Sequence, residues 1–281
     1  MRKKRQLDDP RTLGEPVKGA VVFAFGMVGP GRSAIPGPAL VAILGALGFG
    51  EPTARATILR MRRDGRLTST RRGPVVLYEL TAPSRALSDE VLRPVVGEGA
   101  AWDGVFHALL FSIPERGRAY RDALRRTAVL AGFGLLQPGV FVTTDARRWA
   151  RIEPLLQGAP AGSRLMRGEL RLTLADARAA AAEAWPLGEL GRRYREQIAQ
   201  LERVAAECRA HPPIGALALR TLWEAMALVF GTAVEDPALP AELLPADWPG
   251  DEIRQSVAAA SMALGPAAQA YLRNLMPEAG A

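Results

Sequence analysis

The densest group of chemically distinctive side chains in this sequence is a run of arginines, RATILRMRRDGRLTSTRRG, from Arg55 to Gly73. It holds seven arginines and one aspartate, Asp64. Guanidinium groups bind phosphate oxygens and guanine edges in a bidentate manner, so arginines in this number are typical of a surface that meets a polyanion. A solvated helix face is the more ordinary interpretation of any single row of arginines. The elements around the run therefore have to distinguish the two.

The sequence offers little for catalytic or metal chemistry. It has one cysteine, Cys208, and two histidines, His107 and His211, that lie far apart. Neither a disulfide within the chain nor a zinc cluster is expected. We find no Ser-His-Asp or Cys-His constellation and no phosphate-binding Gly-Lys-Ser/Thr motif. We therefore expect no catalytic residue, no metal and no cofactor, and a protein that is not an enzyme.

Composition indicates a globular protein with an anionic partner. The chain has 281 residues, 48% of them apolar and 23% charged, which fits two or three domains. Its formal net charge is +7 and its pI about 10.2, a balance that favours an anionic partner: nucleic acid, an anionic membrane surface or a phosphorylated ligand. We find no apolar stretch of about 18 residues that would span a membrane, and the run from Ala20 to Val28 is late and short for a signal peptide. A cytoplasmic protein is expected.

The order of elements around the arginines predicts a winged helix-turn-helix over residues 17–82. A mobile basic arm over residues 1–16 precedes it. Val17 to Val28 has the composition of a buried helix, IPGPALVAILGALG starts a second helix, and Glu51 to Asp64 forms a third that Gly65 ends. Two strand-like runs around a basic Gly-Pro tip follow and predict a hairpin.

The third helix is predicted to have one apolar side and one basic side. At 100° per residue, Ala54, Ile58 and Met61 fall within about 60° of one another and form an inward stripe. Asp64 is taken as the one acidic side chain near the arginines, and Arg66 is expected beside the exposed basic face. The predicted DNA-binding residues are the outward side of the helix, its flank and the hairpin tip, namely Thr53, Arg55, Ala56, Arg60, Arg63, Arg71 and Arg72.

The rest of the chain predicts two further domains after a connector at 83–100. Residues 101–175 follow the order β-α-β-β-α-β, which is typical of a ferredoxin-like α/β sandwich. Residues 176–281 are rich in Ala, Leu and Arg and predict a helical C-terminal domain. The predicted fold class is therefore α+β, with a winged helix-turn-helix, a ferredoxin-like sandwich and a helical domain.

Three stretches resemble the PaaX family of transcriptional repressors of phenylacetate catabolism. They are SAIPGPALVAILGALGFGEPTARATILRMRRDGRL, WDGVFHALLFSIPERGRAYRDALRRTAVLAGFGLLQPGVFV and EDPALPAELLPADWPG. The resemblance covers about Val17 to Leu275. It implies a homodimeric repressor that binds double-stranded DNA at palindromic operators and that an acyl-CoA such as phenylacetyl-CoA releases. Arg55 and Arg60 match the recurrent arginines of the family's recognition helix, and Asp64–Gly65 matches its terminating Asp-Gly.

Candidate effector-binding residues lie outside the basic helix. Arg118, Arg121 and Arg125 share one helix face and could clamp the phosphates of coenzyme A, although a solvated face is the plainer interpretation. Trp223 belongs to an apolar stripe that could line a pocket for an aryl group, although such stripes are usually core.

The alternative function is a metal-dependent nuclease built on the ferredoxin-like domain. That chemistry needs a carboxylate near the end of the first strand, whereas Asp103 lies at its start. An RNA-binding protein is disfavoured, because the strands lack a pair of base-stacking aromatic residues.

Overall fold

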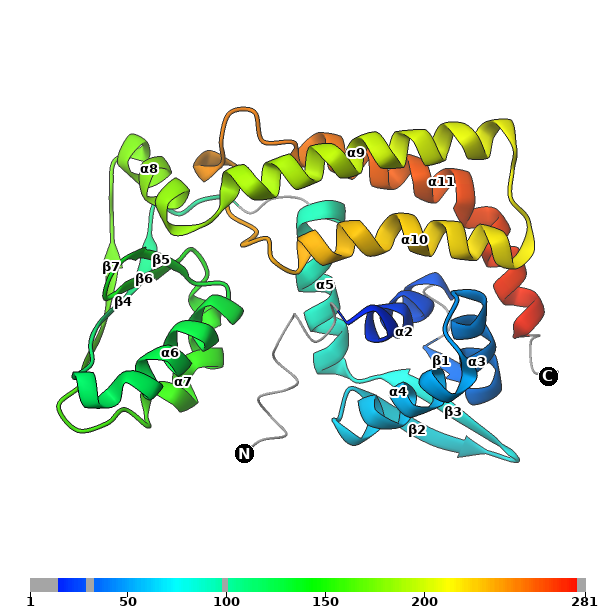
Figure 1. Ribbon diagram of the computed structural model, residues 1–281, viewed down its shortest axis with the longest axis horizontal. Coiled ribbons are helices and arrows are strands. Elements are labelled where there is room, and N and C mark those ends of the chain that lie inside the picture. Colours follow the sequence, from blue (N-terminus) through cyan, green and yellow to red (C-terminus); the bar gives the residue numbers. More distant parts are fainter. Residues whose placement is uncertain (1–14, 29–32, 98–100, 277–281) are drawn as a thin grey trace. The chain divides into compact units, whose positions relative to one another are not determined.

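The computed structural model describes residues 15–28, 33–97 and 101–276. Contacts divide the chain into two compact units (Figure 1). The first comprises the described parts of Met1–Val96, Tyr194–Val234 and Gly250–Ala281, and the second those of Gly97–Arg193 and Glu235–Pro249. The basic arm predicted at 1–16 lies outside the described residues up to residue 14.

The N-terminal part of the first unit contains the predicted helices and hairpin, together with one strand that we did not predict. Its elements are α2 (Pro16–Met27), β1 (Ala34–Pro36), α3 (Gly37–Ala46), α4 (Glu51–Arg63), β2 (Leu67–Arg72) and β3 (Val75–Leu80). Strand β1 pairs with β3, so the sheet has the order β1-β3-β2, with antiparallel neighbours. The second predicted helix starts after β1 because a residue before proline favours extended backbone.

Helix α4 begins and ends at residues whose backbone chemistry requires it. Pro52 occupies its first turn, where a missing N–H costs no hydrogen bond. At the other end Gly65 has a φ of 75°. The N–H of Gly65 bonds to the carbonyl of Arg62 and that of Arg66 to the carbonyl of Met61, at 3.0 and 2.8 Å. This pair of bonds is a Schellman motif, so the chain turns sharply into β2.

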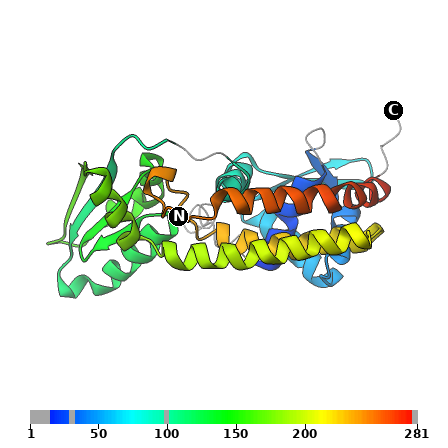
Figure 2. The ribbon, with the colours of Figure 1, turned by 90° about the horizontal axis from the view of Figure 1, so that it is seen from above.

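Four more helices complete or adjoin the first unit: α5 (Ala82–Val96), α9 (Leu187–Ala210), α10 (Gly215–Ala233) and α11 (Gly250–Leu275). Helix α5 replaces most of the predicted connector, because Leu87, Val91 and Val95 recur every four residues and are buried. Helices α10 and α11 pack side by side and also contact α3 and α5 (Figures 1 and 2). Contacts thus group them with the N-terminal elements.

Helix α10 corrects one expectation from the sequence. Its 19 residues are long and apolar enough to cross a membrane by length and composition, although we expected no such stretch. In the structure Leu219, Leu222 and Val229 are buried, and the helix contacts α2, α5 and α11. A helix that is apolar on most sides packs in this way inside the core of a globular unit.

The second unit is a four-stranded antiparallel sheet with helices on both faces. Its elements are β4 (Phe106–Ser112), α6 (Arg118–Leu130), β5 (Gly134–Gln137), β6 (Val140–Thr143), α7 (Trp149–Leu156), β7 (Arg164–Leu170) and α8 (Leu174–Ala184). The strand order is β5-β6-β4-β7. Leu109 and Phe141 pack with residues of α6 and α7, whereas Phe106 packs on the opposite face with residues of α8. The combination of helices with antiparallel sheets fits the α+β prediction.

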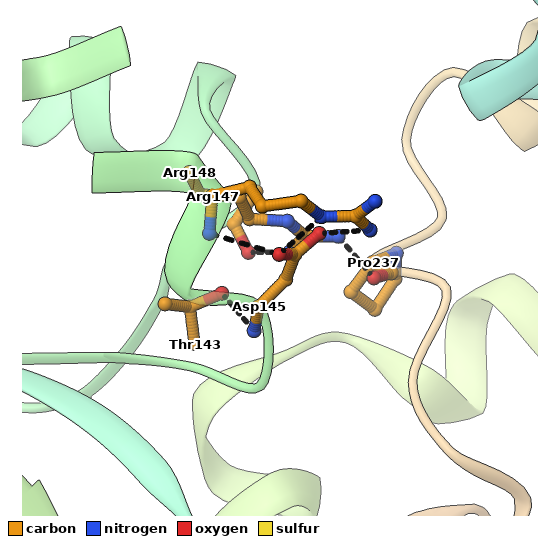
Figure 3. A network of polar contacts seen from close by, with 6 residues as sticks. Thr143, Asp145, Arg147, Arg148 and Pro237 are labelled. Atoms are coloured by element: carbon orange, nitrogen blue, oxygen red, sulfur yellow. Dashed lines mark hydrogen bonds and ion pairs between the residues drawn. The ribbon is translucent and has the colours of Figure 1, made fainter. Parts of the chain in front are cut away.

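A buried arginine joins the loop before α11 to this sheet (Figure 3). The guanidinium group of Arg148 donates to the carbonyl oxygens of Gly132 and Pro237, at 2.5 and 2.7 Å. Beside it, Asp145 accepts from the backbone N–H and the side chain of Arg147. Burial alone would raise the pKa of the Asp145 carboxyl, but these hydrogen bonds and the positive charges outweigh it and lower the pKa to about 2.

Candidate nucleic-acid interface

Helix α4 presents the two sides that the sequence predicts. Ala54, Ile58 and Met61 are buried, and Thr57 joins them on the inward side. The outward residues are exposed: Thr53, Arg55, Ala56, Leu59, Arg60, Arg62 and Arg63. The packing of α4 against α2, α3 and β2 holds the outward side in a fixed orientation within the unit.

The arginines of α4 differ in how far acidic side chains neutralise them. The Nε of Arg55 lies 2.7 Å from a carboxylate oxygen of Glu51, one turn earlier, in an exposed pair. We overlooked this i,i+4 pair when we took Asp64 as the one acidic neighbour. Arg60 donates to the Thr57 hydroxyl at 3.5 Å, and no carboxylate among the described residues pairs with Arg60, Arg62 or Arg63. Positive charge therefore concentrates in the last turn.

The concentration of positive charge in the last turn of α4 is compatible with a stable helix. The C-terminal turn of a helix carries partial negative charge from its free carbonyl groups, and cations there contribute about 0.3–1 kcal/mol each. Arg60, Arg62 and Arg63 all lie in this turn. The folded chain can thus hold three neighbouring guanidinium groups at the surface before any ligand arrives.

The hairpin adds two exposed arginines to this surface, whereas a third arginine, Arg66, is buried. Arg71 and Arg72 are both exposed beside the turn, where Gly73 has a φ of 59° and Arg71 donates to its carbonyl at 3.2 Å. The placement of Arg66 on this surface is wrong, because its side chain is only 1% exposed. Arg66 follows Gly65 in the Schellman motif, a position that packs back toward the helix.

Arg62 belongs to this exposed surface but was not predicted to bind DNA. At 100° per residue it falls near the border of the inward stripe, and it was left out of the predicted set. The structure exposes it, since long side chains at such borders extend toward solvent. This extension was expected from the sequence, yet Arg62 was not included in the predicted DNA-binding set.

The candidate effector residues fall in different units. Arg118 and Arg125 are exposed on α6, and Arg121 pairs with Glu115 at 3.3 Å, all in the second unit. Trp223 belongs to the first unit, where it is 7% exposed and its ring packs against those of Phe23 and Phe49.

The described residues hold no group of three His, Cys, Asp or Glu side chains that could bind a metal ion. Asp103, the carboxylate that we weighed for the nuclease alternative and found at the wrong end of the strand, has a local structural role. Its side chain accepts a hydrogen bond from the N–H of Val105 at 3.0 Å and closes the turn before β4.

Comparison with known proteins gives one consistent family along the chain. The family model described as PaaX-like protein matches residues 20–84, the PaaX protein central Cas2-like domain matches 99–157, and the PaaX-like protein C-terminal domain matches 185–274. The transcriptional repressor PaaX of Escherichia coli (strain K12) is 28% identical over 245 residues, which cover 83% of this chain and 75% of the relative.

A solved structure extends the similarity to the fold. The uncharacterized protein Rv0674 from Mycobacterium tuberculosis is 25% identical and superposes with a TM-score of 0.52, over 90% of this chain and 97% of its own. The three family models succeed one another in the order of the predicted domains. The chain therefore belongs to the PaaX family of transcriptional regulators, which are not enzymes.

Proposed function

We propose that the protein is a cytoplasmic transcriptional repressor that binds double-stranded DNA. In this proposal α2, α3, α4 and the β2–β3 hairpin form a winged helix-turn-helix, and α4 is the recognition helix. The observation that carries it is the exposed last turn of α4, where Arg60, Arg62 and Arg63 have no carboxylate partner among the described residues. The E. coli relative is itself a transcriptional repressor.

The chemistry of this face suits the major groove. Arginine binds the O6 and N7 atoms of guanine in a bidentate manner and also binds phosphates. Thr53 adds a hydroxyl, and the small side chain of Ala56 allows α4 to approach base edges closely. Arg71 and Arg72 at the hairpin tip would contact the adjacent backbone or minor groove.

The remaining domains are proposed to serve assembly and control. Residues 101–175 form a ferredoxin-like sandwich, for which the antiparallel order β5-β6-β4-β7 is support. We propose that this domain and the helical region at 176–281, joined to the winged helix by residues 83–100, hold a homodimer on a palindromic operator. An acyl-CoA such as phenylacetyl-CoA then releases the DNA. No observation favours the nuclease alternative.

The test is selection of a binding site followed by gel-shift titration. Double-stranded DNA is selected from a random pool with the full chain, and the affinity of variants for the selected site is measured. We expect Arg60→Ala and Arg63→Ala each to weaken binding about tenfold, since a good arginine–base contact contributes about 1–3 kcal/mol. Arg203→Ala, which removes an exposed arginine of α9, should change affinity less than twofold.

Two results would remove this function. A pool that yields no enriched sequence would count against sequence-specific binding. Unchanged affinity in both Arg60→Ala and Arg63→Ala would mean that α4 is not the recognition helix.

A further inference from the structure

The first unit contains an apolar cavity of about 510 Å³. Residues of α2, α5, α10 and α11 line it, together with Ser33 before β1 and Leu80 at the end of β3. Its wall is largely aromatic and aliphatic: Phe23 and Phe25 of α2 face Trp223, Met226 and Phe230 of α10. The volume lies within the range of about 300–1,000 Å³ that is typical of small-molecule sites.

Two polar side chains of α5 give this wall the features of a binding site. Ser88 is 7% exposed, and its side chain lines the cavity. Arg85 lies one turn earlier and also lines the cavity. One of its nitrogens donates to the carbonyl of Leu80, and no carboxylate among the described residues pairs with it.

We propose that this cavity is the effector site of the protein and takes a small molecule with an aryl or acyl body and an anionic end. The aromatic wall would bury the body, the Ser88 hydroxyl would bond a carbonyl of the ligand, and Arg85 would bind a carboxylate or phosphate. Asp89 also lines the cavity and would pair with a cationic group of a ligand. That cationic group would then also lie close to the positive charge of Arg85.

The same wall is joined to the recognition helix by hydrogen bonds. The Thr81 hydroxyl, just before α5, lies 3.1 Å from the carbonyl oxygen of Gly65, 3.3 Å from that of Arg66 and 3.0 Å from the Ser84 hydroxyl. The backbone N–H of Thr81 also donates to the carbonyl of Arg66, at 3.0 Å. The start of α5 is therefore tied to the turn that ends α4.

This connection supplies a physical route from ligand to DNA. A ligand changes DNA affinity only if it binds the DNA-competent arrangement less well than another. A body wedged between α5 and α2 shifts α5, and Thr81 transmits the shift to the Gly65–Arg66 turn. The last turn of α4, with Arg60, Arg62 and Arg63, is the part displaced.

The inference rests on the proposed function for its regulatory outcome, but ligand binding can be measured without DNA. Thermal unfolding of the full chain is followed with phenylacetate, phenylacetyl-CoA, octanoate and octanoyl-CoA, which separate free acids from thioesters and aryl from acyl bodies. A ligand that binds the native state raises the Tm. We expect at least one compound to do so.

A glycine in the wall allows the cavity to be filled. Gly26 of α2 lines it, and a Cβ built there meets no atom within 4 Å. Gly26→Leu should therefore fold, leave DNA affinity within twofold and weaken ligand affinity at least tenfold. Gly188→Leu on α9 is the matched control, because its Cβ also meets nothing within 4 Å and it does not line the cavity.

The outcomes separate the cavity from the function. No Tm shift with any of the four compounds, or equal shifts in Gly26→Leu and Gly188→Leu, would overturn the cavity assignment. A ligand response that Gly26→Leu abolishes, in a chain that selects no DNA, would uphold the cavity and overturn the repressor function.

The route through Thr81 has its own test. Thr81→Val keeps the shape and removes the hydroxyl, so it should bind ligand as the parent does while the ligand-induced loss of DNA affinity shrinks at least threefold. Thr81→Ser, which keeps the hydroxyl, should restore the response. An undiminished response in Thr81→Val would exclude the Thr81 hydroxyl from this route.

Discussion

At the scale of single residues, the pairing of each arginine matters more than the number of arginines. Arg55 and Arg60 belong to the same basic helix, yet Arg55 pairs with Glu51 and Arg60 has no carboxylate partner among the described residues. A carboxylate close to a DNA phosphate repels it, and the pair must loosen before Arg55 can bind DNA.

Glu51→Gln should therefore strengthen DNA binding about two- to fivefold at low salt. The same change removes a negative charge from the first turn of α4, so it should lower the free energy of unfolding by about 0.5 kcal/mol. Gel-shift titration and urea unfolding of the variant measure the two effects. Weaker DNA binding in Glu51→Gln would show that the carboxylate positions Arg55 for DNA instead of competing with it.

Asp145 gives a prediction for the dependence of stability on pH. Its pKa is lowered to about 2, below the ordinary value of 3.8, so the ionised form stabilises the fold above about pH 4 and the contribution is lost as the pH falls toward 2. Because Arg147 is largely exposed, we expect about 1 kcal/mol at pH 7.

Urea unfolding of the parent and of Asp145→Asn tests this. The difference in free energy of unfolding between them should be constant from pH 7 to pH 5 and should fall by about half at pH 3, by linkage. A difference that does not change down to pH 3 would mean that the carboxylate is not held ionised by Arg147.

At the scale of elements, the sequence predicted those whose ends are marked by backbone chemistry. Helix α4 was placed to within one residue because Pro52 starts it and Gly65 ends it. Strand β1 was missed because three residues are too few for a pattern of alternation. Helix α5 was taken as a connector because Pro94 lies within it and interrupts its helical pattern.

The positive φ of Gly65 leads to a prediction about the end of α4. Gly65→Ala forces a side chain into a left-handed conformation and should cost about 1–2 kcal/mol of stability. Gly188→Ala, in the first turn of α9, should instead change stability by less than about 0.5 kcal/mol. Thermal unfolding compares the two variants, and equal Tm values would mean that the turn after α4 tolerates a Cβ.

Part of the candidate DNA-binding surface could also be predicted from local patterns in the sequence. Helical periodicity gave the outward side of α4, because residues three and four apart share a face. It could not give the burial of Arg66, which depends on the fold of the turn. The Glu51–Arg55 pair could have been predicted from its i,i+4 spacing but was not considered. The cavity was beyond reach, since it brings Phe23 and Trp223 together across about 200 residues of sequence.

At the scale of the whole molecule, a net charge of +7 would attract DNA without any specific surface. The salt dependence of DNA affinity distinguishes binding through a specific basic surface from attraction by the net charge alone. Each phosphate that a basic side chain neutralises contributes about −0.9 to the slope of log K against log salt. A local surface therefore predicts that the slope depends on which arginine is removed, whereas a diffuse attraction depends on total charge alone.

We expect Arg72→Ala to reduce the magnitude of the slope by about one per protomer, and Arg203→Ala, which removes the same charge from α9, to leave it unchanged. Homodimeric binding adds a second condition, because two recognition helices would read half-sites about 34 Å apart. On DNA with both half-sites the slope should be about twice that on a single half-site. Equal slopes for Arg72→Ala and Arg203→Ala would assign the affinity to net charge, and equal slopes on one and two half-sites would assign it to a single protomer.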